Sequence, residues 1–332
     1  MPESSLLLKI KHKLLNLQVK KPLLNLLLKG AYLKILLAIG GLYMKETVVA
    51  GVQIAIEPNN PEKNMQKIIK WLRNAVKENN PDLVVFPETI TTGFATGLTK
   101  EKLWDLVDTV PGRFTEQISR EAQDLKVYVV FPTYERGKNR GDIYNSSVLI
   151  GPNGDIIGVY RKTHVYPTER QWVIPGDKAE VYETSFGKIG MIICYDGDYP
   201  ELSRALAIKG AEIIVRPSAL LRSFEIWNLT NCARAYDNHV YLIGVNATGP
   251  DADGNYYFGN SMIVSPIAQR LALATAGENV ICAKLDPDPL KYMSYGIKKP
   301  MIFNHLEDRN VKVYEGILKE SKSQFPVSGR YL

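Results

Sequence analysis

Residues 190–201 read GMIICYDGDYPE, a run in which apolar residues lead to a cysteine and a glycine and a proline follow. The apolar residues predict a buried strand that ends at Cys194. Pro200 fits the first position of a helix, with Asp198 or Tyr199 near the N-cap. A free cysteine is usually a small packing residue. A thiol near a helix N-terminus, however, lies in positive potential, which favours the thiolate and therefore a nucleophile.

The same alternation of strands and helices extends on both sides of this stretch. We predict strands at 48–56, 82–87, 127–131, 212–217, 240–246, 261–266 and 280–285, and hairpins at 146–162 and 181–194. We predict helices from Asn60-Pro61 to Asn79, at 115–125, 200–210 and 223–237. Because strands outnumber helices and several are joined by hairpins, one domain with a mixed β-sheet and helices on its outer face is expected.

The excess charge of the chain lies in its first 44 residues. Residues 1–44 hold seven lysines and one glutamate, a net charge of +6 that equals the formal charge of the whole chain. Residues 45–332 therefore carry 34 basic and 34 acidic side chains and are neutral overall. A basic binding surface is not indicated, so no nucleic-acid partner is expected.

Residues 1–44 are predicted to be a basic, amphipathic N-terminal extension. Their apolar residues recur at helical spacing, at Leu7, Ile10, Leu14 and Leu17. Three interpretations stay open. The segment could be a helical arm on a partner subunit, a helix in peripheral contact with a membrane surface, or translated sequence ahead of a start at Met44.

Composition excludes several classes of protein. Three cysteines without paired spacing argue against a disulfide framework and indicate a reducing compartment, so a cytoplasmic location is expected. Four scattered histidines show no zinc-ligand spacing, so no metal site is expected. No uncharged run approaches the roughly 20 residues of a transmembrane helix, and no cleavage-site pattern follows the short apolar run at the start.

Two further strand ends carry residues suited to catalysis, because reactive groups in open α/β sheets gather where strands end. Glu88 follows an apolar strand and a proline, where a carboxylate could act as a general base or simply face solvent. Lys162 follows a hairpin strand, and Glu169 lies seven residues later among aromatic residues and prolines. A thiol with a base and a cation nearby would be an activated nucleophile.

These motifs together resemble the nitrilase superfamily of carbon–nitrogen hydrolases across roughly residues 46–285. The matching stretches are FPET (86–89), YRKTH (160–164), GMIICYDGDYPE (190–201), RAYDN (234–238), VNATG (245–249) and GNSMIVSP (259–266). One departure is Ile267-Ala268-Gln269, where relatives usually have a glycine turn.

The resemblance implies an α/β protein with a nitrilase-like, four-layer-forming αββα sandwich of mixed β-sheets. The hydrolase domain would span 45–286, and the C-terminal tail 287–332 would lie at the subunit interface of a homodimer or higher homo-oligomer. The catalytic set carried over by motif is Glu88, Lys162 and Cys194, with Glu169 as a second glutamate. No cofactor is implied.

The implied function is an amidase that hydrolyses a small linear amide to a carboxylic acid and ammonia through a cysteine thioester. Tryptophan and glutamate commonly follow the nucleophile in true nitrilases, whereas Tyr195-Asp196 follow it here, which favours amides over nitriles. An N-carbamoyl-amine or N-carbamoyl-amino-acid hydrolase is the alternative, and a catalytically silent binding protein is the non-enzymatic one. Candidate substrate-binding residues are Tyr166, Trp172, Tyr195 and Trp227.

Overall fold

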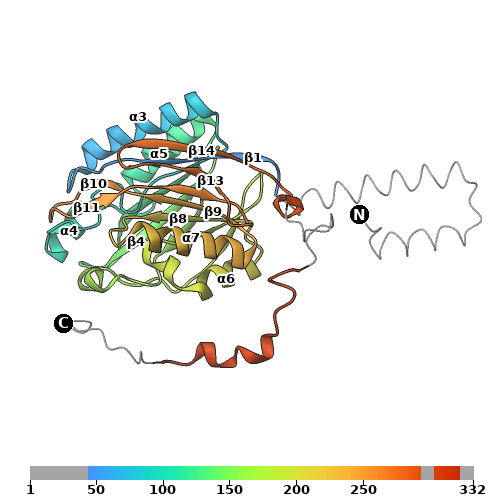
Figure 1. Cartoon of the computed structure of the whole chain (residues 1–332). Coiled ribbons are helices and arrows are strands. Elements are labelled where there is room, and N and C mark those ends of the chain that lie inside the picture. Colours follow the sequence, from blue (N-terminus) through green and yellow to red (C-terminus); the bar gives the residue numbers. More distant parts are fainter. Residues whose placement is uncertain (1–43, 293–302, 322–332) are drawn as a thin grey trace, which may run out of the picture. The chain divides into compact units, whose positions relative to one another are not determined.

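The structure is a computed structural model that describes residues 44–292 and 303–321 (Figure 1). The predicted basic extension therefore lies outside the described residues, apart from Met44. The predicted C-terminal tail is described for residues 287–292 and 303–321. The described residues from Lys45 onward belong to one compact unit.

Two six-stranded mixed sheets form the centre of this unit. The first has the strand order β14-β1-β2-β3-β4-β5, and the second has the order β13-β12-β9-β8-β7-β6. In each sheet three central strands are parallel and the outer strands are antiparallel. Parallel strands place their carboxyl ends at one edge of a sheet, which is where functional groups collect in such folds.

The strands of the first sheet are β1 (Thr47–Gln53), β2 (Leu83–Val85), β3 (Tyr128–Arg136), β4 (Ile143–Ile150), β5 (Ile156–Arg161) and β14 (Asn279–Leu285). Those of the second are β6 (Val181–Glu183), β7 (Lys188–Met191), β8 (Ile213–Ser218), β9 (Tyr241–Asn246), β12 (Met262–Val264) and β13 (Arg270–Leu273). A separate hairpin joins β10 (Thr248–Pro250) to β11 (Tyr256–Phe258).

Helices cover the outer face of each sheet (Figure 1). The helices are α3 (Pro61–Asn79), α4 (Lys100–Leu106), α5 (Arg113–Leu125), α6 (Pro200–Ile208) and α7 (Phe224–Asn238). Helices α3 and α5 pack on the first sheet, and α7 packs on the second. The short 3₁₀ segments are η1 (Pro167–Gln171), η2 (Cys194–Asp198), η3 (Pro289–Tyr292), η4 (Val311–Val313) and η5 (Glu315–Leu318). The predicted αββα sandwich of mixed sheets is confirmed.

The two sheets pack directly against each other through small and branched residues. A Cβ atom added to Gly51 of β1 would lie 2.9 Å from a methyl carbon of Val245 on β9. This distance is shorter than real contacts allow, so β1 and β9 approach as closely as a glycine permits. The apolar face of α3 closes the other side of the first sheet with Met65, Ile68, Leu72 and Ala75.

Local signals explain where the helices begin and end. The side chain of Asn60 accepts the N–H of Lys63 and Pro61 occupies the first turn of α3, as the sequence predicted. Asn80 ends α3 in the left-handed conformation. The sequence did not predict α4, β13 or the β10–β11 hairpin, because each is too short to show a clear period.

The chain turns at Ile267-Ala268-Gln269 although this stretch lacks glycine. The N–H of Ser265 donates to the carbonyl of Gln269 at 2.8 Å, and Ala268 adopts a φ of 60°. An alanine in this left-handed region costs about 1–2 kcal/mol. The chain therefore forms a tight turn here at some energetic cost, without a glycine.

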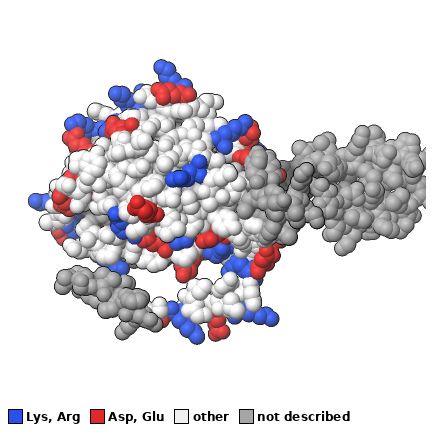
Figure 2. All heavy atoms as spheres, in the orientation of Figure 1, with Lys and Arg blue, Asp and Glu red and all other residues white. Residues whose placement is uncertain are grey.

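Lysines, arginines and acidic residues are interspersed on the face shown in Figure 2. This mixture agrees with the neutral charge of residues 45–332. Among the described residues, no helix is long and apolar enough to cross a membrane.

Candidate active site

Four of the predicted site residues are buried, and three of them follow the ends of strands. Glu88 follows β2, Lys162 follows β5, Glu169 lies in η1, and Cys194 follows β7 at the start of η2. Glu88, Lys162 and Glu169 have no exposed surface, and Cys194 is 7% exposed. Three charged groups without access to water require partners within the protein.

Lys162 supplies those partners to both carboxylates. Its Nζ donates to Glu88 Oε1 at 2.7 Å and to Glu169 Oε2 at 2.7 Å. Burial opposes the charge on Lys162, but Glu169 and Glu88 outweigh it, so the pKa of this lysine is above its usual value. Burial raises the pKa of Glu169, and the neighbouring ammonium of Lys162 opposes that shift. We conclude that Lys162 stays charged.

Asn145 on β4 completes the cluster, and the sequence analysis missed it. Its Nδ2 donates to Glu88 Oε1 at 2.8 Å and to Glu169 Oε1 at 2.6 Å. The second oxygen of Glu88 accepts the backbone N–H of Ala219 at 2.8 Å. The Glu88 carboxylate therefore accepts hydrogen bonds from three separate groups, on Lys162, Asn145 and Ala219. No local signal in the sequence distinguishes it, because Asn145 is followed by Ser146 and Ser147 in the same strand.

Cys194 has an unusual backbone and a protonated thiol. Its φ is 46°, in the left-handed region that a non-glycine residue adopts only when its surroundings enforce it. Burial, and then the negative charge of Glu88, raise the pKa of the thiol to about 12. The expectation of a thiolate stabilised by a helix N-terminus was wrong. Cys194 begins the short η2 rather than α6, and loss of hydration dominates.

Asp196 connects the turn of Cys194 to the loop of Lys162. Its carboxylate is fully buried and accepts five hydrogen bonds, from Ile193 N, Tyr160 Oη, Thr163 Oγ1, His164 N and His164 Nδ1. Ile193 precedes the cysteine, whereas Thr163 and His164 follow the lysine. The cysteine side of the site belongs to the second sheet and the lysine side to the first, so Asp196 ties the two sheets together.

The chain matches the Carbon-nitrogen hydrolase family over residues 48–293. It belongs to this family, within the nitrilase superfamily. A probable nitrilase of Schizosaccharomyces pombe is 32% identical over 81% of this chain and 98% of its own length. An (R)-stereoselective amidase of Pseudomonas sp. is 33% identical over 72% of this chain and 85% of its own length. A carbon–nitrogen hydrolase of Helicobacter pylori superimposes with a TM-score of 0.73 at 28% identity, over 83% of this chain and 99% of that one.

Two of the four predicted substrate-binding residues of this hydrolase lie beside the buried cluster. The rings of Tyr166 and Tyr195 meet edge to face with centroids 5.2 Å apart. Tyr166 also contacts Phe94, whose ring centroid is 5.2 Å from Lys162 Nζ. The backbone N–H of Tyr166 donates to Glu169 at 3.3 Å.

The other two predicted substrate-binding residues, Trp172 and Trp227, are packed against neighbouring side chains and backbone. Trp172 packs in a small apolar cluster, and its Nε1 donates to the hydroxyl of Tyr134 at 3.3 Å. Trp227 is fully buried, donates to the carbonyl of Asn260 at 2.7 Å and lies against Gly244. These contacts give both rings a role in packing, and a role in binding substrate stays a prediction.

A narrow cavity of about 10 Å³ adjoins the buried cluster. Phe94 and Ala219, which contact Lys162 and Glu88, form part of its wall. Tyr257 and Asp251 lie in the same wall, and the hydroxyl of Tyr257 donates to Asp251 at 3.0 Å. The space is about the size of one water molecule.

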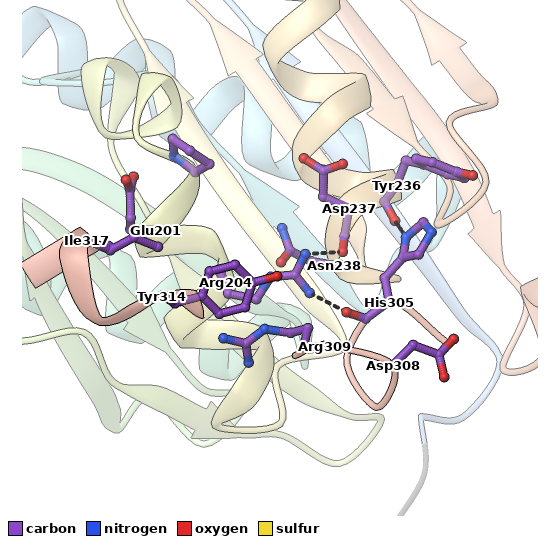
Figure 3. A pocket seen from close by; sticks show the side chains of 11 residues that line it. Glu201, Arg204, Tyr236, Asp237, Asn238, His305, Asp308, Arg309, Tyr314 and Ile317 are labelled. Carbon is purple, nitrogen blue, oxygen red and sulfur yellow. Dashed lines mark hydrogen bonds between the residues drawn. The ribbon is translucent and has the colours of Figure 1, made fainter. Parts of the chain in front are cut away.

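A wider cavity of about 570 Å³ lies elsewhere, between α6, α7 and the segment 303–321 (Figure 3). Arg204 donates there to the carbonyls of His305 and Asp237. None of the four buried site residues lines this cavity. Because size alone does not mark a reactive site, the buried cluster is the candidate active site. In the ranges that the structure describes, no group of three or more His, Cys, Asp or Glu side chains could hold a metal ion.

Proposed function

We propose that this hydrolase is an amidase that cleaves the C–N bond of small linear amides through a thioester on Cys194. The proposal is carried by one observation: a buried carboxylate, Glu88, is paired with a buried ammonium, Lys162, and both charges act on the thiol of Cys194. An amide needs a nucleophile, a proton donor for its nitrogen and a cation for its oxygen. The proposed set contains each of them.

In the first half of the reaction, Glu88 takes the proton of the Cys194 thiol as Sγ attacks the amide carbonyl. The carbonyl oxygen becomes an oxyanion. Lysine has three N–H donors, and the carboxylates use two of those on Lys162. The third would bind the oxyanion, together with the backbone N–H of Tyr195 at the start of η2, where N–H groups lack helical partners. Glu88 then gives its proton to the nitrogen, and ammonia leaves.

In the second half, water hydrolyses the thioester. Glu88 takes a proton from water as its oxygen attacks the carbonyl carbon, and Lys162 again stabilises the oxyanion. The intermediate collapses by breaking the C–S bond. The sulfur leaves with the proton that Glu88 returns, so the thiol is regenerated and a carboxylic acid is released.

Glu169 acts as a positioning residue in this scheme. It binds Lys162 and Asn145, both of which also bind Glu88. The second carboxylate therefore keeps the ammonium charged and directed at the reacting atoms. By resemblance, Glu169 matches a second glutamate in the family's lysine loop, for which positioning of the Glu88 proton or of the attacking group is the expected role.

Amides are favoured over nitriles by the Tyr195-Asp196 pair that follows the nucleophile. Relatives of similar identity include both an (R)-stereoselective amidase and a probable nitrilase, so they support the reaction class and leave the substrate open. A carbamoyl compound would use the same residues and is the second candidate.

A substrate panel tests the proposal by the release of ammonia. Formamide, acetamide and propionamide should give kcat/KM values at least about tenfold above those of benzamide, because each additional group that does not fit a pocket costs about 1–3 kcal/mol. Acetonitrile should be slower than acetamide. A preference for N-carbamoylglycine would favour the carbamoyl alternative. If no compound turns over although Cys194 is alkylated normally, the silent binding protein is favoured.

We also propose a homodimer or higher oligomer in which the C-terminal tail contacts a neighbouring subunit. Several apolar side chains of the segment 303–321 are exposed, namely Val311, Val313, Ile317 and Leu318. Exposed apolar side chains that gather on one segment favour burial against a partner. Light scattering of the full chain at micromolar concentration should give at least twice the monomer mass. A strict monomer would contradict the proposal.

A further inference from the structure

The strained backbone of Cys194 needs a group that holds it. Its left-handed conformation is maintained only if the surrounding structure fixes the peptide groups on both sides. The carbonyl of Cys194 accepts a hydrogen bond from Arg216 Nε at 2.9 Å. Arg216 comes from the middle of β8, a strand that is buried throughout. An arginine in such a strand calls for an explanation.

Arg216 is fully buried and makes hydrogen bonds with each end of its guanidinium. Nη1 donates to Thr230 Oγ1 at 2.8 Å and to Asn231 Oδ1 at 2.7 Å, both on α7. Its guanidinium carbon lies 5.0 Å from the centroid of the Trp227 ring. The arginine is therefore clamped between α7 and the turn that carries the nucleophile.

Gly197 makes room for this guanidinium in the turn itself. A Cβ atom at position 197 would lie 2.1 Å from the guanidinium carbon of Arg216. Gly197 does not have a positive φ, so the glycine is needed for space and not for backbone freedom. The turn and the arginine fit each other closely.

The charge of Arg216 is only partly balanced. The carboxylate that approaches it among the described residues is Asp198, with Oδ1 3.5 Å from Nη2, and Asp198 also forms an ion pair with Arg222. Burial lowers the pKa of Arg216 to about 10, so the guanidinium remains charged near neutral pH. The charged groups that act on the thiol of Cys194 are Glu88, Lys162 and Arg216.

We propose that Arg216 is a positioning residue for Cys194. Its Nε–H fixes the carbonyl of the strained nucleophile, and its buried charge stabilises the thiolate that forms when Glu88 takes the proton. Attractive interactions with the charged form of an acid favour that form. The inference rests on the proposed role of Cys194 as nucleophile. A merely structural arginine would join α7 to β8 and would leave the reactivity of the thiol unchanged.

The first test is the rate at which iodoacetamide alkylates Cys194 at about pH 8, because only the thiolate reacts. Arg216→Met should lower this rate about tenfold, which corresponds to one pKa unit. It should also lower kcat about 100-fold with KM changed less than about threefold, since the lost interaction acts on the transition state. Arg216→Lys keeps the charge and should recover most of the alkylation rate, but only part of kcat. An alkylation rate for Arg216→Met within about twofold of the parent would overturn the proposal.

The second test moves the guanidinium without removing it. Gly197→Ala should displace Arg216 from the carbonyl of Cys194 and lower kcat at least about tenfold. Gly316→Ala is the matched control, because a Cβ at that position meets nothing within 4 Å, and it should behave like the parent. If Arg216→Met does not fold, the kcat of Gly197→Ala becomes the test. A kcat equal to that of the parent would refute the proposal. Alkylation needs no substrate, so it remains informative even if the parent turns over no amide.

Discussion

Cys194→Ala is expected to lower kcat on a good amide substrate by at least about 10⁴-fold, because a thioester enzyme without its nucleophile retains only binding and oxyanion stabilisation. The fold should survive. Alanine adopts the left-handed conformation at a cost similar to cysteine, and the carbonyl that Arg216 binds is unchanged. Ammonia release and the thermal midpoint, measured on the same preparation, check both expectations.

Cys232 and Cys282 supply the matched controls. Both are free and partly buried, and burial raises the pKa of each thiol. Neither belongs to the buried cluster around Glu88. Alanine at either position should keep kcat within about twofold of the parent. Near-parental turnover by Cys194→Ala would refute the thioester mechanism, and loss of turnover in a control would point to a different nucleophile.

Lys162→Met should have the second largest effect, with kcat reduced by more than about 10³-fold. A single neutral oxyanion donor accounts for about 3 kcal/mol, and a charged donor for more. The variant also leaves Glu88 and Glu169 buried without their cation. Removing one partner of a buried ion pair costs about 3–5 kcal/mol of stability. Lys209→Met, which removes a half-exposed lysine paired with Glu180, is the control and should change neither quantity.

The pH dependence of Lys162→Met separates these two effects. Burial already raises the pKa of Glu169, and the variant removes the ammonium that opposes this shift. A carboxyl whose pKa is higher in the folded than in the unfolded protein contributes stability below its unfolded pKa and loses it as pH rises. The denaturation midpoint of Lys162→Met should therefore fall between about pH 5 and pH 8 by more than that of the parent. A flat profile would show that the carboxylates do not depend on the lysine.

The sequence predicted the residues that lie at strand ends, since a polar residue directly after an apolar run is visible without coordinates. Glu88, Lys162 and Cys194 are of this kind, and the structure brings Glu88 and Lys162 into contact. Asn145 and Arg216 lie inside buried strands, where their partners come from distant segments. Their importance depends on those partners, and no local pattern indicates it.

The protonation of Cys194 could not be predicted for a similar reason. The sequence shows a helix start nearby, and it does not show how completely the thiol is removed from water. Desolvation outweighs the positive groups around the sulfur. The roles of Trp172 and Trp227 were open because an aromatic residue near a motif can face a pocket or the core. Only packing distinguishes the two, as the contact of Trp227 with Gly244 shows.

The division of the site between two sheets has a consequence for the rest of the core. Glu88, Lys162 and Asn145 are carried by the first sheet, whereas Cys194 and Ala219 are carried by the second. The distance between Cys194 and Glu88 therefore depends on the spacing between the two sheets, which close-packed residues such as Gly51 set. A change in the volume of core side chains between the sheets should therefore alter the reaction rate, even where these side chains do not touch the substrate. A substitution that adds or removes a methyl group between the two sheets would then change the rate while Glu88, Lys162 and Cys194 stay the same.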